Sequence, residues 1–205
     1  MDRQPSTTEA LRAAYADPPY LGLAEKFYGD RHPEAAAYDD PQTHRELITR
    51  LCEDFDAWAM SLHSPALKTI LPMCPSDVRV MAWVKPFCSF KKNVTVAYAW
   101  EPVIVRGGRK RPTTEPTVRD WIDANITMKR GLTGAKPAKF CRWIFDVLGL
   151  LPGDDFVDVG EELELVLHVL GRKHGAVVRT THQAAHVLHA VDDLQVGAGV
   201  DEAGV

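Results

Sequence analysis

Three things are scarce in this 205-residue chain: long apolar runs, cysteine, and net charge of either sign. No run approaches the ~20 apolar residues of a membrane span, and residues 1–9 are polar, so we expect a cytoplasmic protein without a membrane partner. The four cysteines lack a C-x-x-C spacing, and the histidines between residues 168 and 189 lack fixed ligand spacing, so we expect reduced thiols and no metal site. A hydrophobic content of 45% suffices for one core and hence one domain.

The positive charge of the chain is concentrated in its middle. Residues 101–142 contain ten Lys or Arg and four Asp or Glu, a local charge of +6 in a chain whose net charge is −4. The overall charge is mildly unfavourable for binding a polyanion, whereas this segment favours a phosphate-facing surface. A solvated basic face without a partner is the alternative.

Hydrophobic patterns predict alternating strands and helices. Helix starts are marked by Asp40-Pro41 and Ser64-Pro65, where an N-cap residue precedes a first-turn proline. We expect residues 21–40 and 107–135 to be irregular, and 161–170 fits a strand or a helix equally well. The predicted strands are 11–16, 57–62, 78–84, 94–105 (one bent strand or two), 156–159 and 176–180, and the predicted helices are 41–55, 64–71, 140–148 and 183–194. This order indicates an open α/β sheet. We expect the third of these helices to carry a packed Cys141 and to end at residues 149–153, which begin and end with glycine.

The tetrapeptide Asp17-Pro18-Pro19-Tyr20, directly after the first predicted strand, is the most informative motif. Each proline fixes φ at about −65° and lacks a backbone donor, and a residue before proline is driven to extended geometry. The result is a stiff loop that offers a carboxylate, bare carbonyl oxygens and an aromatic ring. Such a loop suits a planar ring with an exocyclic amine, although a rigid turn without chemistry is the alternative.

Together with two later blocks, the tetrapeptide resembles the amino-methyltransferases of DNA that use S-adenosylmethionine (AdoMet). The type is the one whose target-base loop precedes its cofactor loop, as in small methylases of phages and actinobacteria. The blocks are Trp83-Val84-Lys85-Pro86 with Ala99-Trp100-Glu101-Pro102-Val103-Ile104, and Lys136-Pro137 followed by residues 140–159. The resemblance implies a Rossmann-like, permuted methyltransferase fold: an open, mostly parallel sheet with helices on both faces. Whether that fold is complete at the C-terminus stays open.

The resemblance implies methyl transfer from AdoMet to the N6 amine of adenine, because aspartate stands at the first position of the tetrapeptide. Asp17 and the Pro18 carbonyl would hold the amine so that its lone pair turns toward the methyl group, which is positioning and electrostatic preorganisation. Pro19 would stiffen the loop, and Tyr20 would stack on a base that is flipped out or single-stranded. A cytosine N4 amine or a glutamine amide fits the same geometry.

On the cofactor side, the resemblance implies that AdoMet is bound by Asp158, Gly160, Lys136 and Pro137. The family continues with an aromatic residue and two glycines separated by one small residue, whereas this chain reads Val159-Gly160-Glu161-Glu162. Two glutamates in place of bare backbone would repel the carboxylate of AdoMet. Either the C-terminal part has been replaced, which leaves an impaired methylase, or this chain holds AdoMet in another way.

The expected organisation is a methyltransferase-like domain over residues 1–159 and a divergent segment over 160–205. Residues 107–135 are the candidate DNA-recognition segment. The candidate DNA contacts are Arg109, Lys110, Arg111, Lys129 and Arg130. The sequence therefore predicts an adenine-specific DNA methyltransferase of a restriction–modification or phage setting, monomeric or dimeric. A nucleic-acid-binding remnant and a methyltransferase for another kind of substrate are the alternatives.

Overall fold

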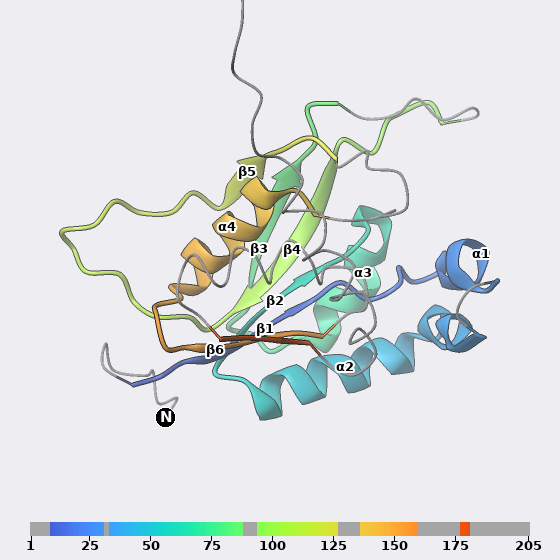
Figure 1. The fold of residues 1–205 in the computed structure, drawn as a ribbon. Helices are drawn as coiled ribbons and strands as arrows, with labels where there is room; N and C mark the ends of the chain where they lie inside the picture. Colours follow the sequence, from blue (N-terminus) through green and yellow to red (C-terminus); the bar gives the residue numbers. More distant parts are fainter. Residues whose placement is uncertain (1–8, 31–32, 88–93, 127–135, 160–176, 181–205) are drawn as a thin grey trace, which may run out of the picture.

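The computed structural model describes residues 9–30, 33–87, 94–126, 136–159 and 177–180 (Figure 1). The strands are β1 (Arg12–Ala16), β2 (Ala57–Ser61), β3 (Arg79–Val84), β4 (Trp100–Arg106), β5 (Trp121–Asp123), β6 (Asp155–Asp158) and β7 (Val177–Thr180). The helices are α1 (Ala24–Tyr28), α2 (Pro41–Asp54), α3 (Leu67–Ile70) and α4 (Ala138–Leu148), with 3-10 helices η1 (Pro33–Asp39), η2 (Ser64–Ala66) and η3 (Leu71–Met73).

Within the described residues, seven strands form one sheet in the order β5-β3-β4-β2-β1-β6-β7. Strand β4 runs antiparallel to its neighbours β2 and β3, and all other pairs are parallel. The other six strands therefore end at one edge of the sheet, the carboxyl edge, and begin at the opposite amino edge. The predicted open, mostly parallel α/β fold is confirmed. No helix in the described part of the chain is long and apolar enough to cross a membrane.

Helix α2 covers one face of the sheet, and its start is encoded locally. The Asp40 side chain accepts a hydrogen bond from the backbone N–H of Gln42 at 2.9 Å, and Pro41 follows in the first turn, as predicted. The apolar side chains of α2 that are buried are Leu47, Ile48 and Leu51. They pack in one cluster with the fully buried Trp58 of β2.

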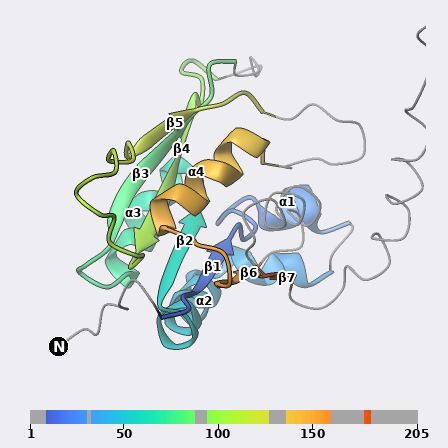
Figure 2. The same cartoon turned by 60° about the vertical axis from the view of Figure 1, so that its left-hand side comes forward.

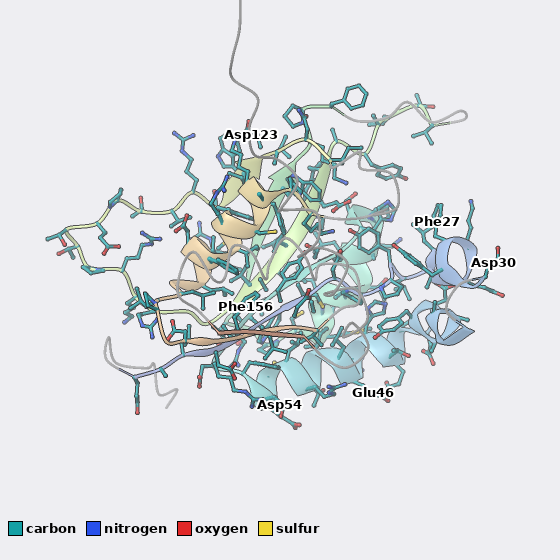
Figure 3. The ribbon with its side chains drawn as sticks, viewed as in Figure 1. Phe27, Asp30, Glu46, Asp54, Asp123 and Phe156 are labelled. Atoms are coloured by element: carbon teal, nitrogen blue, oxygen red, sulfur yellow. The ribbon has the colours of Figure 1, made fainter. Side chains whose placement is uncertain are left out.

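Helix α4 covers the opposite face (Figure 2). Its buried side chains are Phe140, Cys141, Trp143, Ile144, Phe145 and Leu148. The helix ends at Gly149, whose φ of 67° lies in the left-handed region that favours glycine. Phe145 packs edge-on against Phe156 of β6, with ring centroids 4.9 Å apart. Figure 3 labels Phe156. The predicted helix, its glycine stop and the packed thiol of Cys141 are confirmed.

The prediction that residues 21–40 are irregular is wrong, because they contain α1 and η1. Helix α1 has no side-chain cap at its own N-cap residue, Leu23. Instead, the Asp39 carboxylate accepts hydrogen bonds from the backbone N–H groups of Ala24 and Glu25, at 2.9 and 3.1 Å. A cap that comes from 15 positions downstream leaves no local pattern in the sequence.

The start of β4 and the presence of β5 also differ from the prediction. Residues 94–99 do not belong to β4, which begins at Trp100, and β5 lies inside the segment 107–135 that is predicted to be irregular. Strand β5 exists because it pairs with β3, and its three residues are too few for a recognisable alternation. The predicted strand at 176–180 is confirmed as β7, whereas 161–170 and 183–194 lie outside the described residues.

A buried ion pair holds the amino edge together. The Arg109 guanidinium donates to both oxygens of Asp154, at 2.7 and 2.9 Å, and the two side chains are 6% and 3% exposed. Asp154 also accepts hydrogen bonds from the backbone N–H groups of Leu11 and Leu151, and Arg109 donates to the Glu9 carbonyl. These bonds join the segment after β4 to the starts of β1 and β6.

Removing the Asp154 carboxylate should strongly destabilise the fold, because it leaves the Arg109 guanidinium buried without its partner. We expect Asp154→Ala to lower the free energy of unfolding by about 3–5 kcal/mol, measured by urea denaturation at neutral pH. Burial alone would raise the pKa of Asp154, but Arg109 and the backbone donors lower it below its ordinary value. The stabilisation is therefore complete at neutral pH and declines as the pH falls through the acid range.

Asp120→Ala is the matched control. Asp120 forms an ion pair with Arg79 at 2.8 Å, but these side chains are 51% and 65% exposed. Exposed ion pairs contribute about 0–1 kcal/mol, so this variant should lose little stability. Equal losses in the two variants would contradict the structural role of the Arg109–Asp154 pair.

Candidate active site

The tetrapeptide Asp17-Pro18-Pro19-Tyr20 follows β1 at the carboxyl edge of the sheet. The Asp17 side chain is only 7% exposed. On the neighbouring strand β6, Asp158 pairs with Tyr15, two residues before Asp17. The predicted base-binding loop and the predicted cofactor acid are thus brought together where open α/β sheets bind ligands.

Four charged side chains form a buried charge cluster at this edge: Asp17, Lys136, Glu101 and Lys85. Lys136 Nζ lies 2.7 Å from Asp17 Oδ2 and 3.7 Å from Glu101 Oε2. Glu101 forms a second ion pair with Lys85. The four side chains are between 4% and 14% exposed, so charges of alternating sign attract one another with little screening by water.

The members of the charge cluster come from distant parts of the chain. Asp17 follows β1, Lys85 follows β3, Glu101 is the second residue of β4 and Lys136 precedes α4. The ammonium groups of Lys85 and Lys136 both lie over the ring of the buried Trp83, at 4.7 and 5.3 Å from its centroid. These cation–π contacts replace part of the hydration that the two lysines lose.

The two carboxyl groups of the cluster differ in proton affinity. Burial raises the pKa of Asp17 above its ordinary value, and Lys136 only partly opposes this shift. Burial also acts to raise the pKa of Glu101, but Lys136 and Lys85 outweigh it and lower that pKa. Burial alone would lower the pKa of Lys136, yet Asp17 and the other acidic groups raise it well above its usual value. Asp17 is therefore the more basic of the two carboxylates that Lys136 contacts.

Two buried carboxylate oxygens of the charge cluster have no hydrogen-bond partner within the described residues, Asp17 Oδ1 and Glu101 Oε2, and the second of them still lies 3.7 Å from Lys136 Nζ. Asp17 Oδ2 is paired with Lys136, whereas Asp17 Oδ1 is buried and has no hydrogen-bond partner within the described residues. A buried acceptor without a partner is unfavourable for folding. The arrangement is therefore suited to accept an N–H group from a bound molecule.

Three rings in successive contact border the charge cluster, and we call them the aromatic row: Tyr20, His63 and Tyr98. The Tyr20 hydroxyl accepts a hydrogen bond from Lys136 Nζ at 3.5 Å. The Tyr20 and His63 rings are parallel within 4°, with centroids 5.9 Å apart. The His63 and Tyr98 centroids are 4.8 Å apart. The row starts at the tetrapeptide and ends at a side chain that is 45% exposed.

The predicted cofactor residues are placed on two sides of the site. Asp158 ends β6 and is fully buried, at the same edge as the tetrapeptide. Lys136 and Pro137 stand immediately before α4, and the ammonium of Lys136 contacts the two carboxylates of the charge cluster. The structure thus places Lys136 with the base-binding loop. Gly160 lies outside the described residues.

The structure does not bring the predicted DNA contacts at 109–111 to the tetrapeptide. Arg109 is bound to Asp154 at the amino edge, Arg111 donates to the Asp146 carbonyl at the end of α4, and Lys110 between them is exposed. Figure 1 shows this yellow-green segment on the left, across the sheet from α1, which follows the tetrapeptide. Arg109 is therefore reassigned from DNA contact to structural residue. The other two predicted contacts, outside the described residues, are Lys129 and Arg130.

Sequence reasoning assigned no role to Glu101, which the structure places in the site. The feature that could have identified Glu101 is an acidic residue at the start of a strand whose next four residues, 102–105, are buried. A charged residue within a buried strand needs a partner or a function. Its partners, Lys85 and Lys136, follow β3 and precede α4, so the sequence around Glu101 does not identify them.

Comparison with known proteins supports the fold. No family model and no curated protein matches the chain. Among solved structures, the M1.HpyAVI–SAM complex aligns with a TM-score of 0.57 at 12% identity, covering 90% of this chain and 89% of that chain. TTHA0409 from Thermus thermophilus, described as a DNA modification methylase and complexed with S-adenosyl-L-methionine, aligns with a TM-score of 0.54 at 12% identity, covering 90% and 86%. The chain shares its fold with these two proteins, both of which were solved in complex with AdoMet.

Lys136→Met should make stability depend on pH in a defined direction. Without the ammonium, Asp17 and Glu101 stay buried with less compensation, so their folded-state pKa values rise above those of the unfolded chain. Carboxyl groups with raised folded-state pKa values favour folding only while protonated. The stability deficit relative to the wild type should therefore be smallest at about pH 4 and grow as the pH rises to about 8, measured by urea unfolding.

Lys139→Met is the matched control, since it removes an ammonium three residues further along. Lys139 pairs with Asp123 at 2.8 Å, but both side chains are 52% exposed. Stability should change little at any pH, because water and salt screen such a pair. A loss in Lys136→Met that did not vary with pH would rule out the electrostatic role given to Lys136.

Proposed function

We propose that this protein is a DNA methyltransferase that transfers a methyl group from AdoMet to the N6 amine of adenine. The observation that carries the proposal is Asp17 Oδ1, a buried acceptor without a hydrogen-bond partner among the described residues. It lies at the carboxyl edge of a methyltransferase-type sheet, one strand away from Asp158. The likeness in fold to M1.HpyAVI and TTHA0409 supports the proposal.

The tetrapeptide orients the amine. Asp17 Oδ1 accepts one N–H group of the amine, and the Pro18 carbonyl accepts the other. Because both hydrogens are then held, the nitrogen lone pair turns out of the ring plane toward the methyl donor. The two prolines hold these acceptors in place before the substrate arrives, so little reorganisation is needed. Tyr20 stacks on a base that has left the duplex.

The charge cluster accepts the proton that the amine releases during the reaction. As the N–C bond forms and the donor's S–C bond breaks with its electron pair left on sulfur, the amine nitrogen becomes positively charged and must release one proton. Asp17, whose pKa is raised by burial, is the better acceptor of that proton. Glu101 stays ionised because Lys136 and Lys85 lower its pKa. Lys136 keeps Asp17 in place throughout, through the 2.7 Å ion pair.

AdoMet supplies, when bound, an electrophilic methyl group on a sulfonium centre. The residues proposed to hold it are Asp158, for its amino group and ribose, and Gly160, by close backbone approach. Asp158 fits this role because it is a fully buried carboxylate at the end of β6, beside β1. Both structural neighbours were crystallised with this compound, which supports the choice of cofactor.

The proposed target base is adenine, and the proposed DNA contacts are predicted basic residues outside the segment at the amino edge. Aspartate at the first position of the tetrapeptide favours adenine, although a cytosine amine would meet the same acceptors. Lys129 and Arg130 stay the proposed phosphate contacts, because the segment 109–111 lies at the amino edge, away from the base-binding loop.

Labelled methyl transfer tests the proposal directly. Wild-type protein with methyl-labelled AdoMet and unmethylated DNA should place label in DNA, recovered after digestion as N6-methyladenine. Asp17→Ala should lower the rate at least about a hundredfold, because one preorganised polar group in such a site typically contributes about 10²–10³. Asp120→Ala, which removes an exposed carboxylate remote from the tetrapeptide, should keep the wild-type rate.

Three other outcomes of this experiment would contradict part of the proposal. Label recovered as N4-methylcytosine would overturn the choice of base. Absence of label together with salt-sensitive DNA binding would overturn the catalytic proposal and identify a DNA-binding protein that has lost activity. An equal rate in Asp17→Ala would remove Asp17 from the mechanism.

Calorimetry with AdoMet alone tests the cofactor site. We expect binding by the wild type, and about tenfold or greater weakening in Asp158→Ala, since a hydrogen bond to a charged group is lost. Asp155→Ala is the matched control, because Asp155 begins the same strand at the amino edge. Absence of binding up to millimolar AdoMet would refute AdoMet as the cofactor, and equal affinities in the three proteins would refute the role of Asp158.

A further inference from the structure

The aromatic row links the base-binding loop to the surface. Tyr20 belongs to the loop after β1, His63 follows β2, and Tyr98 lies in the connection that precedes β4. All three stand at the carboxyl edge, because β1 and β2 end there and the antiparallel β4 begins there. In the strand order β4-β2-β1-β6, the row extends from β1 toward β4, on the side away from Asp158.

The aromatic row is not part of the protein core. None of its rings belongs to either of the two buried apolar clusters found among the described residues. Tyr98 is 45% exposed, and its ring contact is with His63, at a tilt of 53°. Two adjoining ring contacts that end at an exposed tyrosine leave an aromatic surface available to a ligand.

We propose that His63 and Tyr98 form a stacking site for the nucleotide next to the target base on the same DNA strand. The inference rests on the proposed function. When the target base leaves the duplex, its neighbour loses a stacking partner, and an aromatic side chain at the exit of the site replaces that partner. The row is continuous with Tyr20, so target and neighbour occupy adjacent places along it. Because every base has a π-face, this site accepts any neighbouring base.

A thermodynamic cycle tests the stacking site. The probes are oligonucleotides in which the nucleotide 5′ or 3′ of the target adenine is replaced by an abasic one, and binding is measured by fluorescence anisotropy. For the wild type, one of the two replacements should weaken binding roughly fivefold to a hundredfold, the range expected for one stacked base. Tyr98→Ala should lose this sensitivity, and Tyr98→Phe, which keeps the ring, should retain it.

Trp121→Ala is the matched control, since Trp121 is an aromatic side chain of similar exposure (42%) on the edge strand β5. This variant should show the wild-type sensitivity to the abasic replacement. The inference is overturned if neither replacement affects the wild type, or if Tyr98→Ala keeps the full sensitivity. In those cases methylation of DNA by the wild type still upholds the proposed function, whereas a wild type that binds no DNA overturns both.

Discussion

The ion pair between Lys136 and Asp17 is the interaction on which the candidate site depends. Its two side chains are 4% and 7% exposed, so water does not weaken the attraction. The same ammonium also attracts Glu101, which in turn pairs with Lys85. The end of β1, the β3–β4 ladder and the start of α4 are thereby held in one arrangement, although they are far apart in the sequence. The arrangement leaves one Asp17 oxygen without a protein partner within the described residues.

A buried ion pair between an aspartate and a cation lies at the amino edge of the sheet and another at the carboxyl edge. The two aspartates differ in whether both of their carboxylate oxygens have hydrogen-bond partners. At the amino edge, Asp154 binds Arg109 and two backbone N–H groups, which lowers its pKa. At the carboxyl edge, Asp17 is paired with Lys136 through one oxygen, and burial raises its pKa. Both oxygens of Asp154 have hydrogen-bond partners, so this carboxylate is structural. Asp17 Oδ1 has none within the described residues, so Asp17 can bind an amine and accept a proton.

Local sequence signals predicted those parts of the fold whose causes are local. The capped start of α2 at Asp40 and the stop of α4 at Gly149 depend on neighbouring residues, and both were predicted correctly. Helix α1 was missed because its cap, Asp39, comes from a later segment. Strand β5 was missed because it is defined by pairing with β3 rather than by its own three residues.

The sequence by itself determined the nature of the base-binding loop, because the stiffness of Asp17-Pro18-Pro19-Tyr20 comes from proline geometry and needs no distant contact. Only the tertiary structure decided which residues surround that loop. The alternation of residues along a strand does not indicate whether the strand runs parallel or antiparallel to its neighbours. Since β4 runs antiparallel, Glu101 at its start lies at the same edge as Asp17 and close to Lys136, whereas Arg109 after its end emerges at the opposite edge of the sheet.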